Sequence, residues 1–437
     1  MSTDLVASNE DGTAWFGGPV RALSPLDFDH AQEELENIAD LADKEGCARL
    51  AALLRRDSPL TAFLAAVVEL SPYLRDCARF LPQSLEALFD ERLEARLSHL
   101  NRRIAEAAFA EDASEASVMK ALRSLKREAH FLIALGDLSG EADAQRTVLR
   151  LSELAEACLK SAVDFLLRDA HRQNKLCLPD PADPARGCGW IFLAMGKLGA
   201  SELNYSSDID LIVLVDPEAP AVSDPVEATD LFVRLTRRLV RIMQERTGDG
   251  YVFRTDLRLR PDPGSTPLAL PVDAALNYYE SRGQNWERAA MIKARPVAGD
   301  LKAGESFLAE LQPYVWRKYL DYAAIADIHS IKRQIHAHKG HGEIAVLGHN
   351  IKLGRGGIRE IEFFVQTQQL IAGGRFPELR GRATADVLAR LAESGWISHQ
   401  ASDGLIAEYW FLRTVENAVQ MVADEQVHTL PDSGEEL

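Results

Sequence analysis

Apolar residues recur every three or four positions over most of the first 172 residues. Segments such as "LTAFLAAVVELSPYLRDCARFL" and "LEALFDERLEARLSHLNRRIAEAAFA" show this spacing, and Ala, Leu, Glu and Arg dominate them. Such spacing places the apolar side chains on one face of an α-helix, and these residue types favour helix. The pattern therefore predicts a helical region over residues 1–172, with its charged side chains on solvated faces.

The pattern changes at a stretch rich in proline and glycine, "CLPDPADPARGCGW". Three strand-like runs rich in apolar residues then follow, at residues 190–196, 208–216 and 251–261. Short runs of this kind, bounded by turn residues, are typical of buried strands. Helical spacing returns at residues 226–246, between the second and third runs. We therefore expect a mixed α/β domain over residues 173–300.

Helical spacing dominates again after this domain. The segments "IREIEFFVQTQQLIA" and "GLIAEYWFLRTVENAVQMVA" predict core helices of a C-terminal helical domain over residues 301–437. The sequence stops on "LPDSGEEL", which is typical of a linker, so we expect a fragment of a longer protein. The fold class predicted is α+β and mostly helical, with a mixed sheet and its helices flanked by N- and C-terminal helical domains.

Composition narrows the possible partners. A chain of 437 residues is too long for one compact core, and its 46% hydrophobic and 26% charged content is ordinary for a globular protein. The net charge of −17 disfavours a nucleic-acid partner, and no apolar run is long enough to suggest a membrane span. Five scattered cysteines without CxxC spacing, and a polar N-terminus, favour a cytoplasmic protein with reduced thiols. We expect a monomer.

Two aspartates interrupt the apolar run "NYSSDIDLIV". Asp208 and Asp210 are two positions apart, so on a strand they project from the same face. Carboxylates this close repel each other unless a cation lies between them, and Mg²⁺, or Mn²⁺ in its place, takes such oxygen ligands together with substrate phosphates. A lone Asp-x-Asp pair is a weak signal, because most such pairs lie in surface turns.

The later run "FRTDLRLRP" strengthens this interpretation. Asp256, Arg258 and Arg260 alternate along it, so we expect all three on one face of a third strand. Asp256 could complete the metal site, and the two arginines could bind phosphate oxygens. The combination predicts a phosphoryl- or nucleotidyl-transfer site. The structural alternative, a ladder of Asp–Arg salt bridges at a sheet edge, would not need the glycine turn that precedes the first aspartates.

That turn lies in "AMGKLGASEL", where Gly196, Lys197 and Gly199 precede Ser206, Ser207 and the aspartates. Glycines allow backbone N–H groups to approach phosphates closely. The segment is not a Walker A loop, because a leucine follows the lysine where that motif has Ser or Thr. We predict phosphate or nucleotide binding at Gly196, Lys197, Ser206 and Ser207.

Two further segments are rich in basic residues. In "SRGQNWERAAMIKARPV", Trp286 could stack on a base or pack into the core; we favour packing, with Arg288 or Lys293 near phosphate. In "KLGRGGIREIE", Arg355 and Arg359 flank a Gly-Gly turn that enters a helix. A helix start with arginines can hold an anion, and a tight interdomain turn is an equally good interpretation.

A histidine-rich segment runs through residues 327–349. Its histidines are His329, His336, His338, His341 and His349. A zinc site requires ligands that converge on one tetrahedron, and no cysteine or HExxH motif accompanies these residues. We therefore expect an exposed helix end and loop here rather than a structural metal.

Longer motifs carry a family resemblance. "GKLGASELNYSSDIDLIVLVD" resembles the signature of the nucleotidyltransferase superfamily. Together with "VFRTDLRLRPDPGSTPLALP", "RGQNWERAAMIKARPVAGD" and "IKLGRGGIREIEFFVQTQQL", it resembles the bifunctional glutamine synthetase adenylyltransferase/adenylyl-removing family over about residues 115–430. That family has two tandem halves, each with its own active site. One signature occurs here, and "ELNYSSDIDL" is similar to the version of the N-terminal half.

The resemblance implies an activity and its partners. The N-terminal half removes AMP from adenylylated glutamine synthetase by phosphorolysis: orthophosphate attacks the phosphorus and ADP leaves, which regulates nitrogen assimilation. Asp208, Asp210 and Asp256 would hold the metal, and we choose Arg258 and Arg260 for the incoming phosphate. The C-terminal helices resemble a domain of the PII-uridylyltransferase, which implies contact with the PII signal protein.

The residues themselves leave the direction of the reaction open. The same site would serve adenylyl transfer from ATP onto a protein, or another nucleotidyl transfer. A non-catalytic module that senses PII is a third possibility, although three carboxylates on apolar strands count against it.

Overall fold

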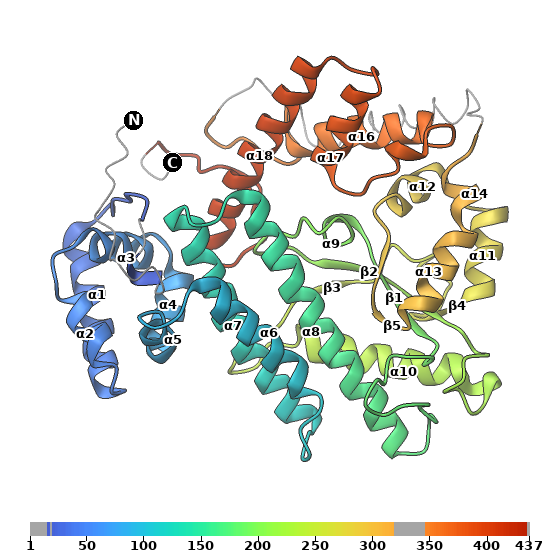
Figure 1. Ribbon diagram of the computed structural model, residues 1–437, viewed down its shortest axis with the longest axis horizontal. Coiled ribbons are helices and arrows are strands. Elements are labelled where there is room, and N and C mark those ends of the chain that lie inside the picture. The colour runs from blue at the N-terminus through green and yellow to red at the C-terminus, as the bar shows by residue number, and fades with distance from the viewer. Residues whose placement is uncertain (1–14, 18–19, 319–345, 435–437) are drawn as a thin grey trace.

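The computed structural model describes residues 15–17, 20–318 and 346–434. Within these ranges the chain has the mostly helical α+β fold that the apolar pattern predicts, with one five-stranded mixed sheet (Figure 1). After the short 3₁₀ turn η1 (Trp15–Gly17), the helices of the N-terminal region are α1 (Phe28–Lys44), α2 (Ala48–Leu54), α3 (Pro59–Leu70), α4 (Pro72–Phe80), α5 (Pro82–Ala87), α6 (Leu93–Ala107), α7 (Glu115–Ser139) and α8 (Ala144–Arg172). Serine or aspartate side chains cap several of their N-termini, such as Ser58 at α3 and Asp143 at α8, which satisfies backbone N–H groups there.

The sheet is built around an antiparallel pair of strands. Its strands are β1 (Trp190–Ala194), β2 (Ile209–Val215), β3 (Thr255–Asp256), β4 (Leu270–Pro271) and β5 (Arg295–Gly299). β1 pairs antiparallel with both β2 and β5, whereas β2 pairs parallel with β3 and β4 on its other side. The parallel register of β2 and β3 places Asp210 directly beside Asp256.

The expectation of a long third strand at residues 251–261 is wrong, because β3 contains two residues. The chain turns immediately afterwards, and Arg260 folds back so that its guanidinium donates to the carbonyl oxygens of Leu257 and Pro263 at 2.8 and 2.7 Å. The prolines of "RPDPG" lack the N–H groups that a strand would need for pairing. Asp256, Arg258 and Arg260 therefore do not share one strand face.

Side chains of β1 and β2 alternate between two hydrophobic cores. Trp190 and Phe192 face the helices α7, α8 and α10 (Pro225–Gln244), whereas Ile191 and Leu193 face the opposite layer. That layer contains α11 (Val272–Ser281), α12 (Asn285–Met291), α13 (Leu301–Glu310) and α14 (Gln312–Val315). Because helices cover both faces, β1 is apolar at every position and β2 at every position except Asp210, as the apolar runs in the sequence predict.

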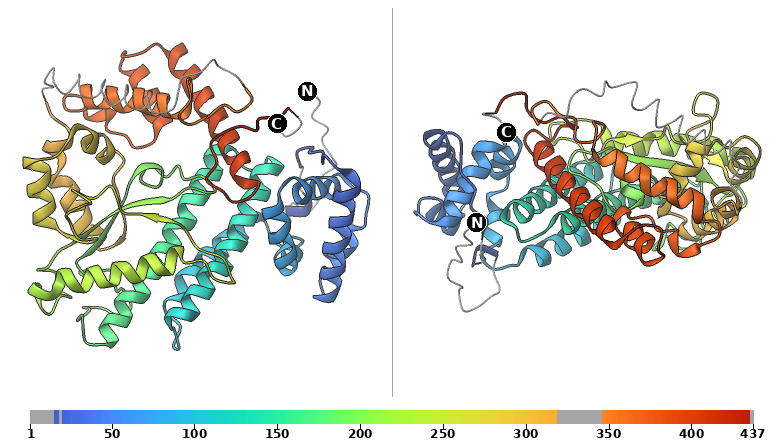
Figure 2. Two further views of the ribbon diagram at one scale, coloured as in Figure 1. Left: turned by 180° about the vertical axis from the view of Figure 1, so that it is seen from behind. Right: turned by 90° about the horizontal axis from the view of Figure 1, so that it is seen from above.

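The C-terminal helices form a separate layer along one edge of the sheet (Figures 1 and 2). They are α16 (Ile358–Ala372), α17 (Thr384–Glu393) and α18 (His399–Met421), with the 3₁₀ turn η2 (Pro377–Leu379) between the first two. These helices have their own core, which includes Leu388 and Tyr409. The end of α18 also reaches the N-terminal region, where the Ser71 hydroxyl donates to the Met421 carbonyl at 2.7 Å.

Two further expectations concern the cysteines and membranes. All five cysteines are free thiols; Cys177 is exposed and the other four are buried. Among the residues that the structure describes, no helix is long and apolar enough to cross a membrane.

The short helix α9 (Gly196–Gly199), which follows β1, generates a stability prediction. A Cβ atom at Gly199 would lie 2.1 Å from the carbonyl oxygen of Lys293 and 2.7 Å from that of Ala194. We expect Gly199→Ala to displace this backbone and to lower the free energy of unfolding by about 1–3 kcal/mol, the usual cost of overpacking. The measurement is thermal unfolding followed by circular dichroism.

The matched control is Gly404→Ala on the exposed face of α18. A Cβ atom there meets no atom within 4 Å, so the change should be neutral or stabilising by up to about 1 kcal/mol through helix propensity. Equal melting temperatures for Gly199→Ala and the wild type would contradict the tight approach of these backbones.

Candidate active site

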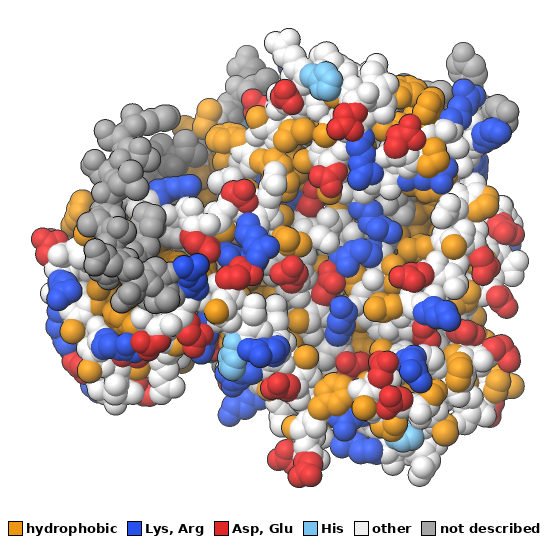
Figure 3. All heavy atoms as spheres, in the orientation of Figure 1, with side chains coloured by type: hydrophobic (Ala, Val, Ile, Leu, Met, Phe, Trp, Pro, Cys, Tyr) orange, Lys and Arg blue, Asp and Glu red, His pale blue; other side chains and the backbone are white. Residues whose placement is uncertain are grey.

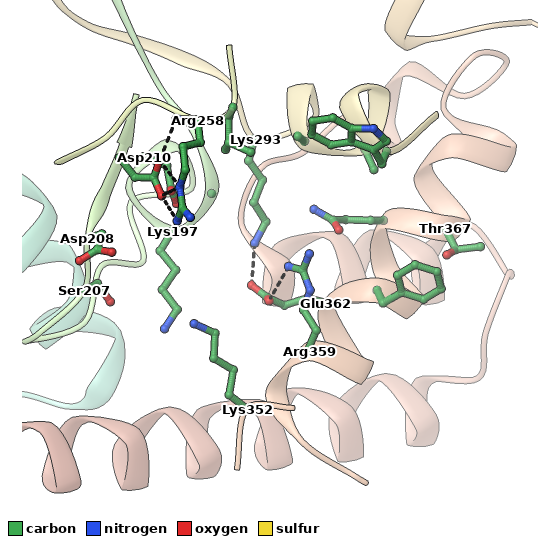
Figure 4. A pocket seen from close by; sticks show the side chains of 18 of the residues that line it. Lys197, Ser207, Asp208, Asp210, Arg258, Lys293, Lys352, Arg359, Glu362 and Thr367 are labelled. Atoms are coloured by element: carbon green, nitrogen blue, oxygen red, sulfur yellow. Dashed lines mark hydrogen bonds and ion pairs between the residues drawn. The ribbon is translucent and has the colours of Figure 1, made fainter. Parts of the chain in front are cut away.

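A cavity of about 410 Å³ lies where the start of β2 and the neighbouring strand β3 face the start of α16 (Figure 4). The sheet side supplies carboxylates, and the α16 side supplies basic and polar side chains. In the space-filling view, basic and acidic side chains are interspersed across the middle of the molecule, below the C-terminal helices (Figure 3). The cavity therefore combines negative and positive walls, which suits a ligand with phosphate groups and a cation.

Three carboxylates converge on the sheet side of the cavity. Asp208 and Asp210 come from the start of β2, and Asp256 lies beside Asp210 on β3. Burial, together with the charges of Asp256 and Asp208, raises the pKa of Asp210 to about 6. Burial is the largest cause of this rise, and the part that comes from the two neighbouring carboxylates is repulsion that a cation would relieve.

Arginines pair with the two outer carboxylates. The Arg254 guanidinium donates to Asp208 at 2.7 Å, and Arg258 forms an ion pair with Asp256. Hydrogen bonding from Arg258 holds the pKa of Asp256 below its usual range. The Arg258 side chain is 83% exposed, so it can leave Asp256 at little cost in packing.

The donor set suits a divalent cation, although its present arrangement does not form a metal site. Within the described ranges, no group of three His, Cys, Asp or Glu side chains is positioned to hold a metal ion as the side chains stand. Carboxylate oxygens are the ligands that Mg²⁺ prefers, and phosphates usually complete its coordination. Asp208, Asp210 and Asp256 therefore fit such an ion if Arg258 swings away from Asp256.

The glycine turn packs against the Asp210 carboxylate. Gly196 has a φ of +52°, and a Cβ atom there would lie 2.9 Å from Oδ2 of Asp210. Glycine therefore permits both the left-handed backbone and the close approach of the Asp210 side chain. The predicted turn forms the single helical turn α9 and lies against the carboxylate cluster.

Lys197 lies at the cavity wall, but its ammonium is held by protein groups. It donates to both oxygens of Glu416 on α18 at 2.8 Å and to the Asn204 side chain at 2.5 Å. Burial alone would raise the pKa of the fully buried Glu416, but Lys197, with His428 and Arg413, holds that pKa well below its usual range. The structure thus places this lysine in a buried ion pair between α9 and α18.

A second buried cluster connects Lys293 to α16. The Lys293 ammonium lies 3.0 Å from Glu362 and 3.7 Å from Glu202, and Arg359 lies 3.5 Å from Glu362. Burial opposes ionisation of Glu362, but Lys293 and Arg359 hold its pKa well below its usual range. Figure 4 shows Glu362 between these two basic side chains, with Lys352 pointing toward Lys197 nearby.

The structure brings most of the residues singled out in the sequence to one cavity. Those that line it are Gly196, Lys197, Ser207, Asp208, Asp210, Asp256, Arg258 and Lys293. Ser206 is buried beside it: its N–H donates to Gln420 and its hydroxyl accepts from Arg254. Arg260 lies in the turn after β3, and the Arg288 guanidinium donates to the carbonyl oxygens of Tyr314 and Val315 at 3.1 and 3.2 Å.

Trp286 corrects another expectation. The sequence favours packing of Trp286 in the core, but its side chain is 42% exposed and lines the cavity. The helix α12 is only seven residues long and presents this side toward α16, so the indole borders the site instead of the interior.

Other cavity residues were missed or left undecided in the sequence. Arg359 lines the cavity at the start of α16, whereas Arg355 is exposed outside it. Lys352 and Glu362 also line it, and Arg254 pairs with Asp208; none of these three was singled out. The density of charged residues in "KLGRGGIREIE" and "FRTD" indicates polar segments, but it does not indicate which of their side chains reach the cavity. His329, His336, His338 and His341 lie outside the described residues.

The mixed sheet, its flanking helices and the aspartates at its paired strand ends define a nucleotidyltransferase-type fold. Comparison with known families agrees with this class. Residues 61–310 match the glutamate-ammonia ligase adenylyltransferase family, and residues 329–437 match the GlnD PII-uridylyltransferase family. The chain belongs to the glutamate-ammonia ligase adenylyltransferase family.

Similar proteins carry the description bifunctional glutamine synthetase adenylyltransferase/adenylyl-removing enzyme. The chain is 68% identical to the one from Mesorhizobium japonicum, over 97% of this chain and 43% of that protein. It is 61% identical to the one from Brucella melitensis biotype 1, over 95% of this chain and 42% of that protein. The chain thus spans less than half the length of these curated relatives.

The ion pair between Lys197 and Glu416 generates a prediction for stability. Glu416→Gln leaves the buried Lys197 ammonium without its counter-charge, so we expect a loss of about 3–5 kcal/mol in the free energy of unfolding. Urea unfolding followed by circular dichroism measures this loss. The control Glu408→Gln changes an exposed residue of the same helix and should stay within about 0.5 kcal/mol of the wild type. Equal losses in the two variants would contradict the special role of the buried pair.

Proposed function

We propose that this chain removes AMP from an adenylylated tyrosine of glutamine synthetase by phosphorolysis. An oxygen of orthophosphate attacks the AMP phosphorus, the bond from phosphorus to the tyrosine oxygen breaks, and ADP and unmodified tyrosine are released. The observation that carries the proposal is the convergence of Asp208, Asp210 and Asp256 on a cavity whose opposite wall holds Lys352 and Arg359. Membership of the family makes glutamine synthetase the protein substrate to test first.

A divalent cation is part of this proposal. Asp208, Asp210 and Asp256 would hold Mg²⁺, or Mn²⁺ in its place, once Arg258 releases Asp256. Such an ion would neutralise charge on the phosphoryl oxygens and on the departing tyrosine oxygen. The raised pKa of Asp210 supports a cation at this position, because a positive charge would relieve the repulsion among the carboxylates.

The side chains on the other walls have binding roles in the proposal. Lys352 and Arg359 would bind phosphate oxygens, and Arg258 becomes available for the same task when it leaves Asp256. The exposed indole of Trp286 can stack on the adenine ring. Orthophosphate is already an anionic nucleophile, so these groups need only neutralise charge and hold the reactants in line.

The direction of the reaction rests on the sequence motif. "ELNYSSDIDL" resembles the N-terminal, adenylyl-removing half of the bifunctional family, and the chain covers less than half of its relatives. The same cavity would serve adenylyl transfer from ATP, which is the alternative direction at the same site. The match of residues 329–437 to the PII-uridylyltransferase family supports PII as a regulatory partner.

A direct assay tests the proposed reaction. We expect the purified chain, mixed with adenylylated glutamine synthetase, phosphate and Mg²⁺, to release ADP, and removal of either phosphate or the metal to stop this release. Asp210→Asn should lower the rate by roughly a hundredfold or more, because it removes a charged ligand from the centre of the carboxylate cluster. Chromatography of the nucleotides measures the product.

The control variant is Asp403→Asn, which changes an exposed aspartate on α18 away from the cavity and should keep the wild-type rate. Transfer of AMP from ATP onto unmodified glutamine synthetase, with no ADP release in the first assay, would reverse the proposed direction. Full activity in Asp210→Asn would remove the carboxylate cluster from the mechanism.

A further inference from the structure

A second hollow opens onto the same carboxylates. It has a volume of about 800 Å³ and lies between α10 and the segment of residues 251–260 that contains β3. Asp208, Asp256 and Arg258 line both this groove and the cavity described above. The carboxylate cluster can therefore be approached from two directions, through two differently shaped openings.

The groove is strongly basic although the chain carries a net charge of −17. Its arginines are Arg237, Arg246, Arg254, Arg258 and Arg260, and among the described residues the acidic side chains that line it are the two aspartates of the cluster. Arg254 and Arg258 pair with those aspartates, and Arg260 is held by backbone carbonyls. Neither aspartate of the groove forms an ion pair with Arg237 or Arg246.

Other arginines of α10, in contrast to Arg237, form ion pairs. Arg238 and Arg241 both pair with Glu115, so the helix neutralises its charge toward the N-terminal region. Arg237 and Arg246 are exposed at the groove, and within the described residues no ion pair involves either of them. Arg246 instead lies over the Tyr251 ring, 5.2 Å from its centroid, which holds its guanidinium in place.

We propose that this groove binds an acidic polypeptide segment next to the modified tyrosine of the protein substrate. This inference rests on the proposed function, because it assigns the groove to the polypeptide and the enclosed cavity to the nucleotide. A reaction at one phosphorus that joins a nucleotide to a polypeptide needs separate room for each, and the two openings provide it. The tyrosine side chain enters beside Asp208 and Asp256.

The charge of the groove favours an acidic segment. Exposed arginines attract carboxylates over distances near the Debye length, which increases the rate of encounter and orients the partner. A nucleic acid would need an extended positive surface, whereas the positive charge here is confined to one groove of an acidic chain. Binding should accordingly weaken as salt increases.

The test measures binding without turnover. Adenylylated glutamine synthetase is immobilised in phosphate-free, low-salt buffer, and its dissociation constant is measured for the wild type and for the Arg237→Glu/Arg246→Glu double variant. We expect the double variant to bind about tenfold more weakly, which corresponds to about 1.4 kcal/mol. The control Arg234→Glu reverses an exposed arginine on the same helix that does not line the groove, and should change the constant less than twofold.

Two results would overturn the proposal. One is a double variant that binds like the wild type; the other is an equal loss in Arg234→Glu, which would indicate an effect of overall charge. Arg237→Ala/Arg246→Ala provides a milder variant, and its melting temperature should match that of the wild type because both side chains are exposed. This double alanine variant should bind adenylylated glutamine synthetase several-fold more weakly than the wild type does.

Steady-state kinetics separate this proposal from the proposed function. We expect the double variant to raise the KM for adenylylated glutamine synthetase and to leave the KM for phosphate unchanged. A raised KM for phosphate with unchanged protein binding would make the groove a small-anion site and overturn the docking proposal. If the wild-type chain binds adenylylated glutamine synthetase but releases no ADP, the proposed reaction is wrong and the proposed docking in the groove still stands.

Discussion

Buried ion pairs between the sheet and the C-terminal helices are the constraint on which the site depends. Lys197, next to β1, is held by Glu416 of α18, and Lys293, next to β5, is held by Glu362 of α16. A buried charge is costly without its partner, so a shift of these helices away from the sheet would leave several charges unpaired. The two pairs therefore fix the distance between the walls of the cavity.

The same constraint decides what the basic residues can do. A lysine after a glycine suggests a phosphate ligand, but the Lys197 ammonium is already committed to Glu416 and Asn204. Positive charge for a ligand comes instead from Lys352 and Arg359, which the C-terminal helices bring to the opposite wall. The carboxylates of the proposed site and the cations of its opposite wall thus come from parts of the chain about 100–150 residues apart, and the buried pairs bring them together.

The pattern of apolar and polar residues along the chain was enough to predict the buried strand β2 and the amphipathic helices. The run that became β2 is buried on both faces, and the helix at residues 226–246 has a regular apolar stripe, so both could be placed from sequence. Asp208 and Asp210 stood out because charged residues rarely occur in such a run. The register that places Asp256 beside Asp210 comes from the parallel pairing of β2 and β3, which the sequence does not specify.

The predictions that failed, and the residues that were missed, have several physical causes. Arg260 and Arg288 donate to backbone carbonyl oxygens, and any residue can supply a carbonyl, so no sequence pattern announces that partner. The short extent of β3 reflects proline chemistry just beyond it, which outweighed its alternating side chains. Lys352 and Glu362 belong to the site only through tertiary packing, which spacing along the chain does not encode.

In the proposed site, nucleotide binds between the sheet and the C-terminal helices. Hydrogen exchange measured by mass spectrometry, with and without Mg²⁺ and ADP, tests it most directly. Ligand should protect the backbone amides of two segments together, residues 196–210 at the carboxylates and residues 352–359 before and at the start of α16. Protection of one segment without the other, or protection confined to the groove along α10, would contradict it.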